Sequence, residues 1–292
     1  MSSPHPQSPA AGDHAPGYRA MRWNMDWITR PLFGLVLAGL AILVLSYAPE
    51  YFAMLVVAIT LLAAYEWHRM VRRSENYLPG ILLTGVAVVL AVFLLMAMHQ
   101  AWPAILVVFL GAGIAAGLAR FQDQHPAWQA LGVIYLGLPA VALVSLRAFP
   151  ERGALVIIGL FLIVWATDTG ALIFGKLIGG PRMAPRLSPG KTWAGTIGGS
   201  VTAAIVFGLY ILLLNGVFWS AALFALLFSI LAHAGDLFES FVKRRFGLKN
   251  SGSLIPGHGG VLDRMDSTIF ASIALAILIF AAHFDILFGA TS

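Results

Sequence analysis

The sequence predicts an all-α, polytopic integral membrane protein with about nine transmembrane helices. Of the 292 residues, 59% are hydrophobic and only 11% are charged, whereas soluble domains carry about 25% charged residues. The apolar residues form long blocks without alternation, each wide enough to cross a hydrocarbon core of roughly 30 Å, which favours helices over a β-barrel. These blocks cover residues 31–48, 51–67, 79–98, 101–119, 127–147, 153–176, 193–215, 217–238 and 265–289.

The basic residues predict the orientation of these helices. If the N-terminus is cytoplasmic, all 18 Lys and Arg residues except Arg147 and Arg152 fall on the cytoplasmic side, as loops on that side require. The C-terminus is then outside. Residues 1–22 are rich in Pro, Ser, Ala and His and contain no apolar core, so we expect a disordered cytoplasmic tail instead of a cleaved signal peptide. The chain has no cysteine, which excludes thiolate metal sites and cysteine nucleophiles.

Polar residues are unevenly distributed between the two halves of the chain. The first five apolar blocks are nearly free of ionisable groups, and the polar content is concentrated after residue 165. We therefore predict a transmembrane scaffold region at 23–150 and a transmembrane catalytic region at 151–292. The catalytic region should contain two cytoplasmic loops, at 176–192 and 239–264.

Four aspartates are candidates for chemistry, because a charge inside a membrane is costly and usually functional. Asp168 lies about 15 residues into an inward-running block, which is ~22 Å deep, and Asp236 lies about 19 residues into another, which is ~28 Å along it. Asp263 and Asp266 open the last block at the cytoplasmic face. All four should reach the same level, the cytoplasmic third of the bilayer. For Asp168 and Asp236 the alternative is an internal salt bridge.

Helical spacing groups some of these residues with others. Asp236, Ser240 and Lys243 stand at i, i+4 and i+7 and should form one stripe. Asp263 and Asp266 stand at i and i+3 near a helix N-terminus, where simple helix capping is the alternative to a ligand role. Glu66, with Arg69 one turn later, is expected to form an interfacial ion pair without chemistry.

The loop at 176–192 ends in Gly190-Lys191-Thr192, which invites comparison with a P-loop. That comparison fails, because Pro185 stands where the pattern needs glycine and no strand is expected before it. What remains is a flexible loop whose cations and hydroxyls suit phosphate oxygens. The alternative is an ordinary positive-inside loop. In the second loop, His258 lies between glycines and could donate to a phosphate, although a single loop histidine is more often neither donor nor acid.

Carboxylates beside cations are consistent with one anionic ligand if a divalent metal bridges them. Aspartates bind Mg²⁺ through one or two carboxylates together with substrate phosphates, and Lys and Arg neutralise the remaining charge. This pattern is typical of phosphoryl or nucleotidyl transfer.

The stretch from Ser240 to Asp266 closely resembles the signature of the phosphatidate cytidylyltransferase family. It reads Ser240, Lys243-Arg244, Lys249-Asn250 and Pro256-Gly257-His258-Gly259-Gly260-Val261-Leu262-Asp263-Arg264-Met265-Asp266. The motifs Asp168-Thr169-Gly170-Ala171, Ser188-Pro189-Gly190-Lys191-Thr192-Trp193 and Gly235-Asp236 are similar to family motifs and follow in the right order. The resemblance covers roughly residues 160–270. Asn250 and Ala194 depart from it, since the family has Asp at the first position and many members have Glu at the second.

The resemblance implies that the chain is an enzyme that makes CDP-diacylglycerol and pyrophosphate from CTP and phosphatidate. It implies that Asp236 and Asp263 hold Mg²⁺ and that these two residues, Lys243 and Asp266 are catalytic. Substrate phosphates or the nucleotide would contact Asp168, Ser188, Lys191, Thr192, Arg244, Lys249, His258 and Arg264. It further implies a second, monovalent cation, a homodimer, a bacterial-type plasma membrane and no nucleic-acid partner.

Two other classes remain open from the sequence. A related CTP-dependent lipid enzyme, such as a CDP-archaeol synthase or a polyprenol kinase, would share the nucleotide chemistry, because apolar helices do not distinguish acyl from isoprenoid chains. A transporter with intramembrane carboxylates is less favoured. Transporters usually bind substrate near the midplane between internal repeats, whereas these charges lie at one face and no repeat is visible.

Overall fold

The structure is a computed structural model that describes residues 39, 43–45, 47–252, 254 and 259–281. The chain divides into a segment at 1–41 and a unit at 42–292, and the elements below all lie in the second. They are the helices and strands α2 (Pro49–Met70), α3 (Leu78–Met98), α4 (Ala101–Phe121), α5 (Pro126–Arg147), α6 (Gly153–Leu177), β1 (Arg182–Ala184), β2 (Ser188–Thr192), α7 (Trp193–Leu213), α8 (Phe218–Arg245) and α9 (Leu262–Ala281).

Seven of these helices, α2 to α8, are long and apolar enough to span a membrane. The all-α, polytopic membrane fold is therefore confirmed, and the count of nine stays a prediction. The first expected block, 31–48, lies almost entirely outside the described residues, as do the tail at 1–22 and the end of the ninth block. Proline at the first turn starts α2, α3 and α5, where its missing N–H costs no helical hydrogen bond.

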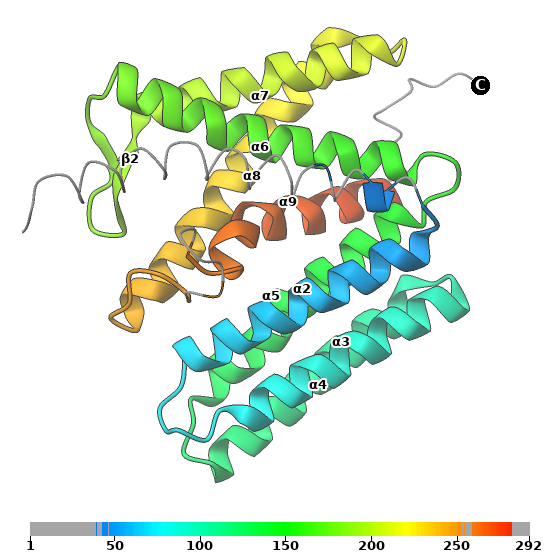
Figure 1. Ribbon diagram of the computed structural model, residues 1–292, viewed down its shortest axis with the longest axis vertical. Coiled ribbons are helices and arrows are strands. Elements are labelled where there is room, and N and C mark those ends of the chain that lie inside the picture. Colours follow the sequence, from blue (N-terminus) through cyan, green and yellow to red (C-terminus); the bar gives the residue numbers. More distant parts are fainter. Residues whose placement is uncertain (1–38, 40–42, 46, 253, 255–258, 282–292) are drawn as a thin grey trace, which may run out of the picture. The chain divides into compact units, whose positions relative to one another are not determined.

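The helices pack as two groups (Figure 1). Helices α2, α3, α4 and α5 pack on one another, and α6, α7, α8 and α9 form the second group. Helix α5 has contacts with α6 and α9 as well as with its own group, and α2 also touches α9. Helix α5 is the most buried of the seven candidate spans. The two groups are therefore joined along α5 and α9.

The structure differs from the expectations in two places, the end of one helix and the conformation of one loop. The predicted block at 217–238 is part of a longer helix, because α8 continues to Arg245 with Lys243, Arg244 and Arg245 in its last turn. Cations at a helix C-terminus interact favourably with its dipole, so the basic run extends the helix instead of ending it.

The other difference is in the loop expected to be flexible between α6 and α7. It contains a hairpin, in which β1 pairs antiparallel with β2 and Arg182 stands opposite Thr192. The hairpin leads directly into α7, which begins at Trp193.

Candidate active site

One cleft gathers most of the candidate residues. It has a volume of about 460 Å³ and is bordered by α6, β2, α7, α8 and α9. Four carboxylates line it together with two cations, so the four aspartates lie together, while their level in the bilayer stays a prediction. Its lining includes Asp168, Thr169, Lys191, Thr192, Thr196, His233, Asp236, Asp263, Arg264, Asp266 and Ser267.

Two walls of the cleft come from α6 and α7, whose backbones approach closely. A Cβ added at Gly170 would lie 3.0 Å from Gly199 Cα, and one at Gly195 would lie 2.8 Å from the Ala171 carbonyl oxygen. Neither position has room for a side chain. Small residues allow this approach in membranes, where close van der Waals packing replaces the hydrophobic effect between helices. This close contact between α6 and α7 places Asp168 on α6 beside the start of α7.

Strand β2 of the hairpin places Lys191 in the lining of the cleft. Lys191 Nζ lies 2.5 Å from Asp236 Oδ2 on α8, an ion pair in which one N–H of the ammonium is directed at the carboxylate. An ammonium carries three donors, so two remain for a phosphate. Ser240 Oγ lies 3.4 Å from Asp236 Oδ1, as the predicted stripe along α8 requires, whereas Lys243, its third member, contacts Glu239 and Asp263.

Thr192 is placed in the cleft, but its hydroxyl already has a structural role. It accepts a hydrogen bond from Gly195 N at 3.1 Å and thereby caps the N-terminus of α7. Such a cap satisfies one of the free amides in the first helical turn. Arg244 was also predicted to bind substrate, but it lies outside the cleft. Its Nε donates to the Leu187 carbonyl at 3.2 Å, which ties α8 to the turn of the hairpin.

Asp263 is held by several donors. Lys243 Nζ lies 2.7 Å from its Oδ1, and Gly260 N donates to Oδ2 at 3.0 Å and Ser251 N at 3.2 Å. Burial raises the pKa of the Asp263 carboxyl, but Lys243 and these amides outweigh it and hold the pKa below its usual range. Asp263 is therefore an anion that both caps a loop and faces the cleft.

Glu239 is a buried acid that the sequence reasoning missed. Its side chain is fully buried, its Oε2 lies 3.1 Å from Lys243 Nζ, and its Oε1 has no hydrogen-bond partner among the described residues. Lys243, which does not line the cleft, thus links Glu239 to Asp263 from behind. The i to i+4 spacing of Glu239 and Lys243 resembles a surface ion pair, so the sequence carried no signal for the burial of Glu239.

Glu66 contradicts the ion pair expected from the sequence. It is 1% exposed, and its Oε2 accepts from Leu262 N at 2.9 Å and from Ser251 Oγ at 3.2 Å. Arg69 instead donates to the Tyr65 hydroxyl at 3.2 Å. The prediction was wrong because spacing along one helix does not reveal a partner 185 residues away.

The remaining predicted residues lie elsewhere. Ser188 starts β2 outside the cleft lining, and Lys249 and Asn250 are exposed in the turn after α8. His258 is outside the described residues. His233 and Thr196 line the cleft although the sequence reasoning did not select them, and His233 Nε2 lies 3.3 Å from the Thr196 carbonyl oxygen.

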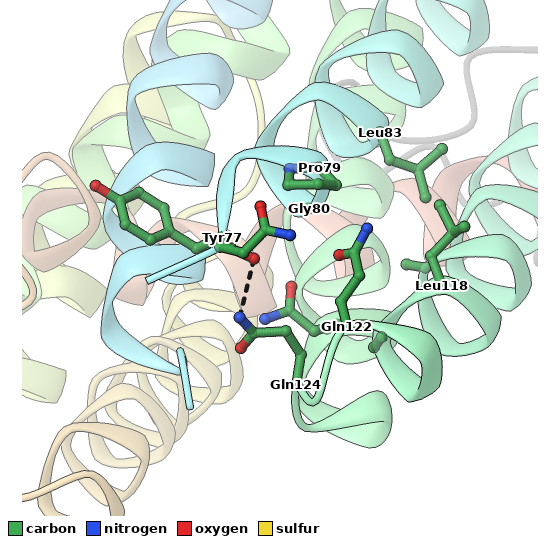
Figure 2. A pocket seen from close by; sticks show the side chains of 11 residues that line it. Tyr77, Pro79, Gly80, Leu83, Leu118, Gln122 and Gln124 are labelled. Carbon is green, nitrogen blue, oxygen red and sulfur yellow. Dashed lines mark hydrogen bonds between the residues drawn. The ribbon is translucent and has the colours of Figure 1, made fainter. Parts of the chain in front are cut away.

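A second pocket lies in the other helical group and has room for a single water, with a volume of about 10 Å³. Figure 2 shows Gln124 beside Tyr77 and Pro79, where its Nε2 donates to the Asn76 carbonyl at 2.9 Å. Gln129 also lines this pocket; its Oε1 lies 2.5 Å from His68 Nδ1, and its buried Nε2 has no partner among the described residues. One water would satisfy that amide. This pocket is too small for a substrate.

The donor set of the larger cleft fits a hard cation such as Mg²⁺, which prefers carboxylate and phosphate oxygens. Among the described residues, no three acidic or histidine side chains are already grouped as metal ligands. Asp236 and Asp263 each pair with a lysine instead. A divalent ion here would therefore take part of its coordination from substrate phosphates.

Comparison with known proteins extends the resemblance to nearly the whole chain, well beyond residues 160–270. The model of the Cytidylyltransferase family matches residues 28–282. The phosphatidate cytidylyltransferase of Brucella suis biovar 1 is 36% identical over 259 residues, which are 88% of this chain and 93% of that protein.

Shorter matches agree with this one. The phosphatidate cytidylyltransferase of Staphylococcus haemolyticus is 47% identical over 121 residues, 41% of this chain and 46% of that protein. The one from Rickettsia typhi is 34% identical over 176 residues, 58% and 77% respectively. With a membrane fold, a cleft of carboxylates and cations, and a match along most of its length, the chain belongs to the cytidylyltransferase family.

Proposed function

We propose that this protein is a phosphatidate cytidylyltransferase, which forms CDP-diacylglycerol and pyrophosphate from CTP and phosphatidate in phospholipid synthesis. The observation that carries the proposal is the cleft in which Asp168, Asp236, Asp263 and Asp266 face Lys191 and Arg264. Membership of the family and the relatives named phosphatidate cytidylyltransferase support it. The cleft lies between membrane-spanning helices, where a lipid headgroup and a soluble nucleotide can meet.

The reaction joins one phosphate to another. An oxygen of the phosphatidate phosphate attacks the α-phosphorus of CTP, the bond from that phosphorus to the bridging oxygen of the β-phosphate breaks, and pyrophosphate leaves. The attacking phosphate is already ionised, so no general base is needed to activate it. The protein must instead bring two anions together and neutralise the charge of the leaving group. We propose that Lys191 and Arg264, which line the cleft, provide this neutralisation, and that Lys243 holds Asp263 in position.

Asp236 and Asp263 are the residues we propose to hold Mg²⁺, with Asp168 and Asp266 beside them. When bound, the ion would polarise a phosphoryl oxygen and offset negative charge in the transition state. The second, monovalent cation and the homodimer implied by the family resemblance stay predictions.

We propose a bacterial-type plasma membrane location with a cytoplasmic N-terminus and an outer C-terminus. The distribution of Lys and Arg supports this orientation. Single cysteines can be introduced at Arg186 and Asn250 because the chain has none of its own. We expect both to resist an impermeant thiol reagent in intact cells and to react after lysis. Labelling of either from outside would contradict the orientation.

The activity is tested with purified protein, CTP, Mg²⁺ and defined lipids, by measuring pyrophosphate and the lipid product. We expect CDP-diacylglycerol from phosphatidate. Product from an isoprenoid phosphate alone would indicate a related CTP-dependent lipid enzyme, and release of CDP with phosphorylated lipid would indicate a kinase. No turnover with any of these lipids would refute the proposed function.

A further inference from the structure

Glu66 is buried in the helical group opposite the cleft, yet all its described partners belong to the segment that carries Asp263. Its neighbour on α2, Trp67, belongs to a buried apolar cluster that also contains Tyr135 of α5, Val242 of α8 and Leu262 of α9. A carboxylate is costly in such surroundings unless donors satisfy it. Its position therefore calls for a reason beyond packing.

The partners of Glu66 explain its position. Leu262 is the first residue of α9, and its N–H has no intrahelical acceptor. Glu66 Oε2 supplies that acceptor at 2.9 Å and also accepts from Ser251 Oγ at 3.2 Å. One oxygen thus joins two positions that flank residues 253–258 in the chain. A negative charge at the start of α9 also interacts favourably with the helix dipole.

Ser251 connects Glu66 to the cleft. Its hydroxyl donates to Glu66, while its backbone N–H donates to Asp263 Oδ2 at 3.2 Å. Gly260 N donates to the same Asp263 oxygen at 3.0 Å, and Gly260 packs directly on Glu66. A Cβ at Gly260 would lie 2.6 Å from Glu66 Oε2, and one at Gly252 would lie 2.9 Å from Glu66 Cγ. Both amides that orient Asp263 are therefore located by contact with Glu66.

We propose that Glu66 is a positioning residue for the reaction. It fixes Ser251, Gly260 and the N-terminus of α9, and through them it fixes the direction of the Asp263 carboxylate. Helix α2, which lines no part of the cleft, would then contribute to turnover through this one side chain. The role requires hydrogen-bond acceptance in a defined place and does not require contact with substrate.

Three variants test this role. Glu66→Ala removes the acceptor and leaves a void. Glu66→Gln keeps an acceptor oxygen of the same reach, and Ser251→Ala removes the hydroxyl donor while keeping the amide that binds Asp263. Glu50→Ala is the matched control, because Glu50 is an exposed acid at the other end of the same helix.

We expect Glu66→Ala to lower kcat by about 100-fold, the loss typical of a catalytic group displaced by about 1 Å, while KM for CTP changes little. Glu66→Gln should recover activity to within about tenfold of the natural chain. Glu50→Ala should have no effect. The effects of Glu66→Ala and Ser251→Ala should be less than additive, because they disturb one connection. Loss of activity that merely follows loss of folded protein, or equal loss in Glu66→Gln, would overturn the role.

Hydrogen exchange tests the positioning role of Glu66 independently of the proposed function. Peptides covering Ser251 and the first turn of α9 should exchange faster in Glu66→Ala than in the natural chain, while peptides from α6 and α7 stay unchanged. Exchange that is unaltered there would overturn the inference. The kinetic measurements rest on the proposed function, cytidylyl transfer. If the natural chain lacks that activity, the proposed function is refuted, and the exchange measurement alone then tests the positioning role of Glu66.

Discussion

The two helical groups both bury polar side chains, but they direct them differently. In α6 to α9 the acids and cations face a cleft, as Asp236 and Lys191 do. In α2 to α5 several buried polar side chains pair within the packing, as His68 does with Gln129 and with Thr84 at 2.7 Å. The comparison shows that a buried polar group indicates a reaction site only where an open volume adjoins it. Glu66 is intermediate, since it lies in the first group and its partners lie in the second.

The largest effect should come from the proposed metal ligands. Asp236→Asn and Asp263→Asn each keep the shape of the side chain and remove its charge, so transition-state stabilisation of several kcal/mol should be lost. We expect turnover to fall by at least about 1,000-fold in either variant, with folded and membrane-inserted protein. Asp123→Asn is a control, because Asp123 is an exposed acid that pairs with Arg73 at 3.3 Å. Normal turnover at saturating Mg²⁺ would remove that aspartate from the metal site.

A smaller and more selective effect is expected at Lys191. Lys191→Ala should raise KM for CTP by about tenfold, equivalent to ~1.4 kcal/mol, and change KM for phosphatidate less. The reason is that Lys191 lies in β2 and lines the cleft, on the side predicted to be cytoplasmic, from which a soluble nucleotide would enter. Arg186→Ala, on the exposed turn of the same hairpin, should leave both constants near their original values. A raised KM for phosphatidate alone would contradict the assignment.

In the first group the expected effect is on stability. Gln129→Leu removes a buried partner of His68, which should lower the free energy of unfolding by about 1–3 kcal/mol. Thermal unfolding in detergent should show a lower Tm, while KM for CTP is unchanged. Gln122→Leu, at a half-buried position in the same small pocket, should change Tm less. A Gln129 variant with normal Tm and impaired CTP use would contradict the distinction between a structural role for polar groups in α2 to α5 and a role in the reaction for those in α6 to α9.

The smallest effect is expected at Asn250, where the chain departs from its family's pattern. Asn250 is exposed in the turn after α8, and both Asn and Asp favour turns and accept hydrogen bonds. Asn250→Asp should therefore change kcat/KM by less than about tenfold. A change of a hundredfold or more, with an altered Mg²⁺ requirement, would place this residue at the metal.

Much of the site could be predicted because charge is rare in apolar helices. Asp168 and Asp236 stand out for that reason, and helix geometry gave them a common depth. Glu66 and Glu239 did not stand out, because each is followed by a cation at i+3 or i+4 and resembles one half of a surface pair. Thr192 belongs to a family motif and was therefore predicted to bind substrate, but its hydroxyl caps α7. The hairpin was missed because its strands are three and five residues long and show no alternation.

The close contact between α6 and α7 has a consequence for handling the protein. Because the contact is between backbones that approach at glycines, it does not depend on excluding water and does not change with the solvent that surrounds the apolar surface. The separation of the two walls should then be the same in short-chain detergent, nanodisc and native bilayer. A methyl group at Gly170 or Gly195 would clash with the facing helix, so alanine at either position should force the two walls apart without touching any charged residue.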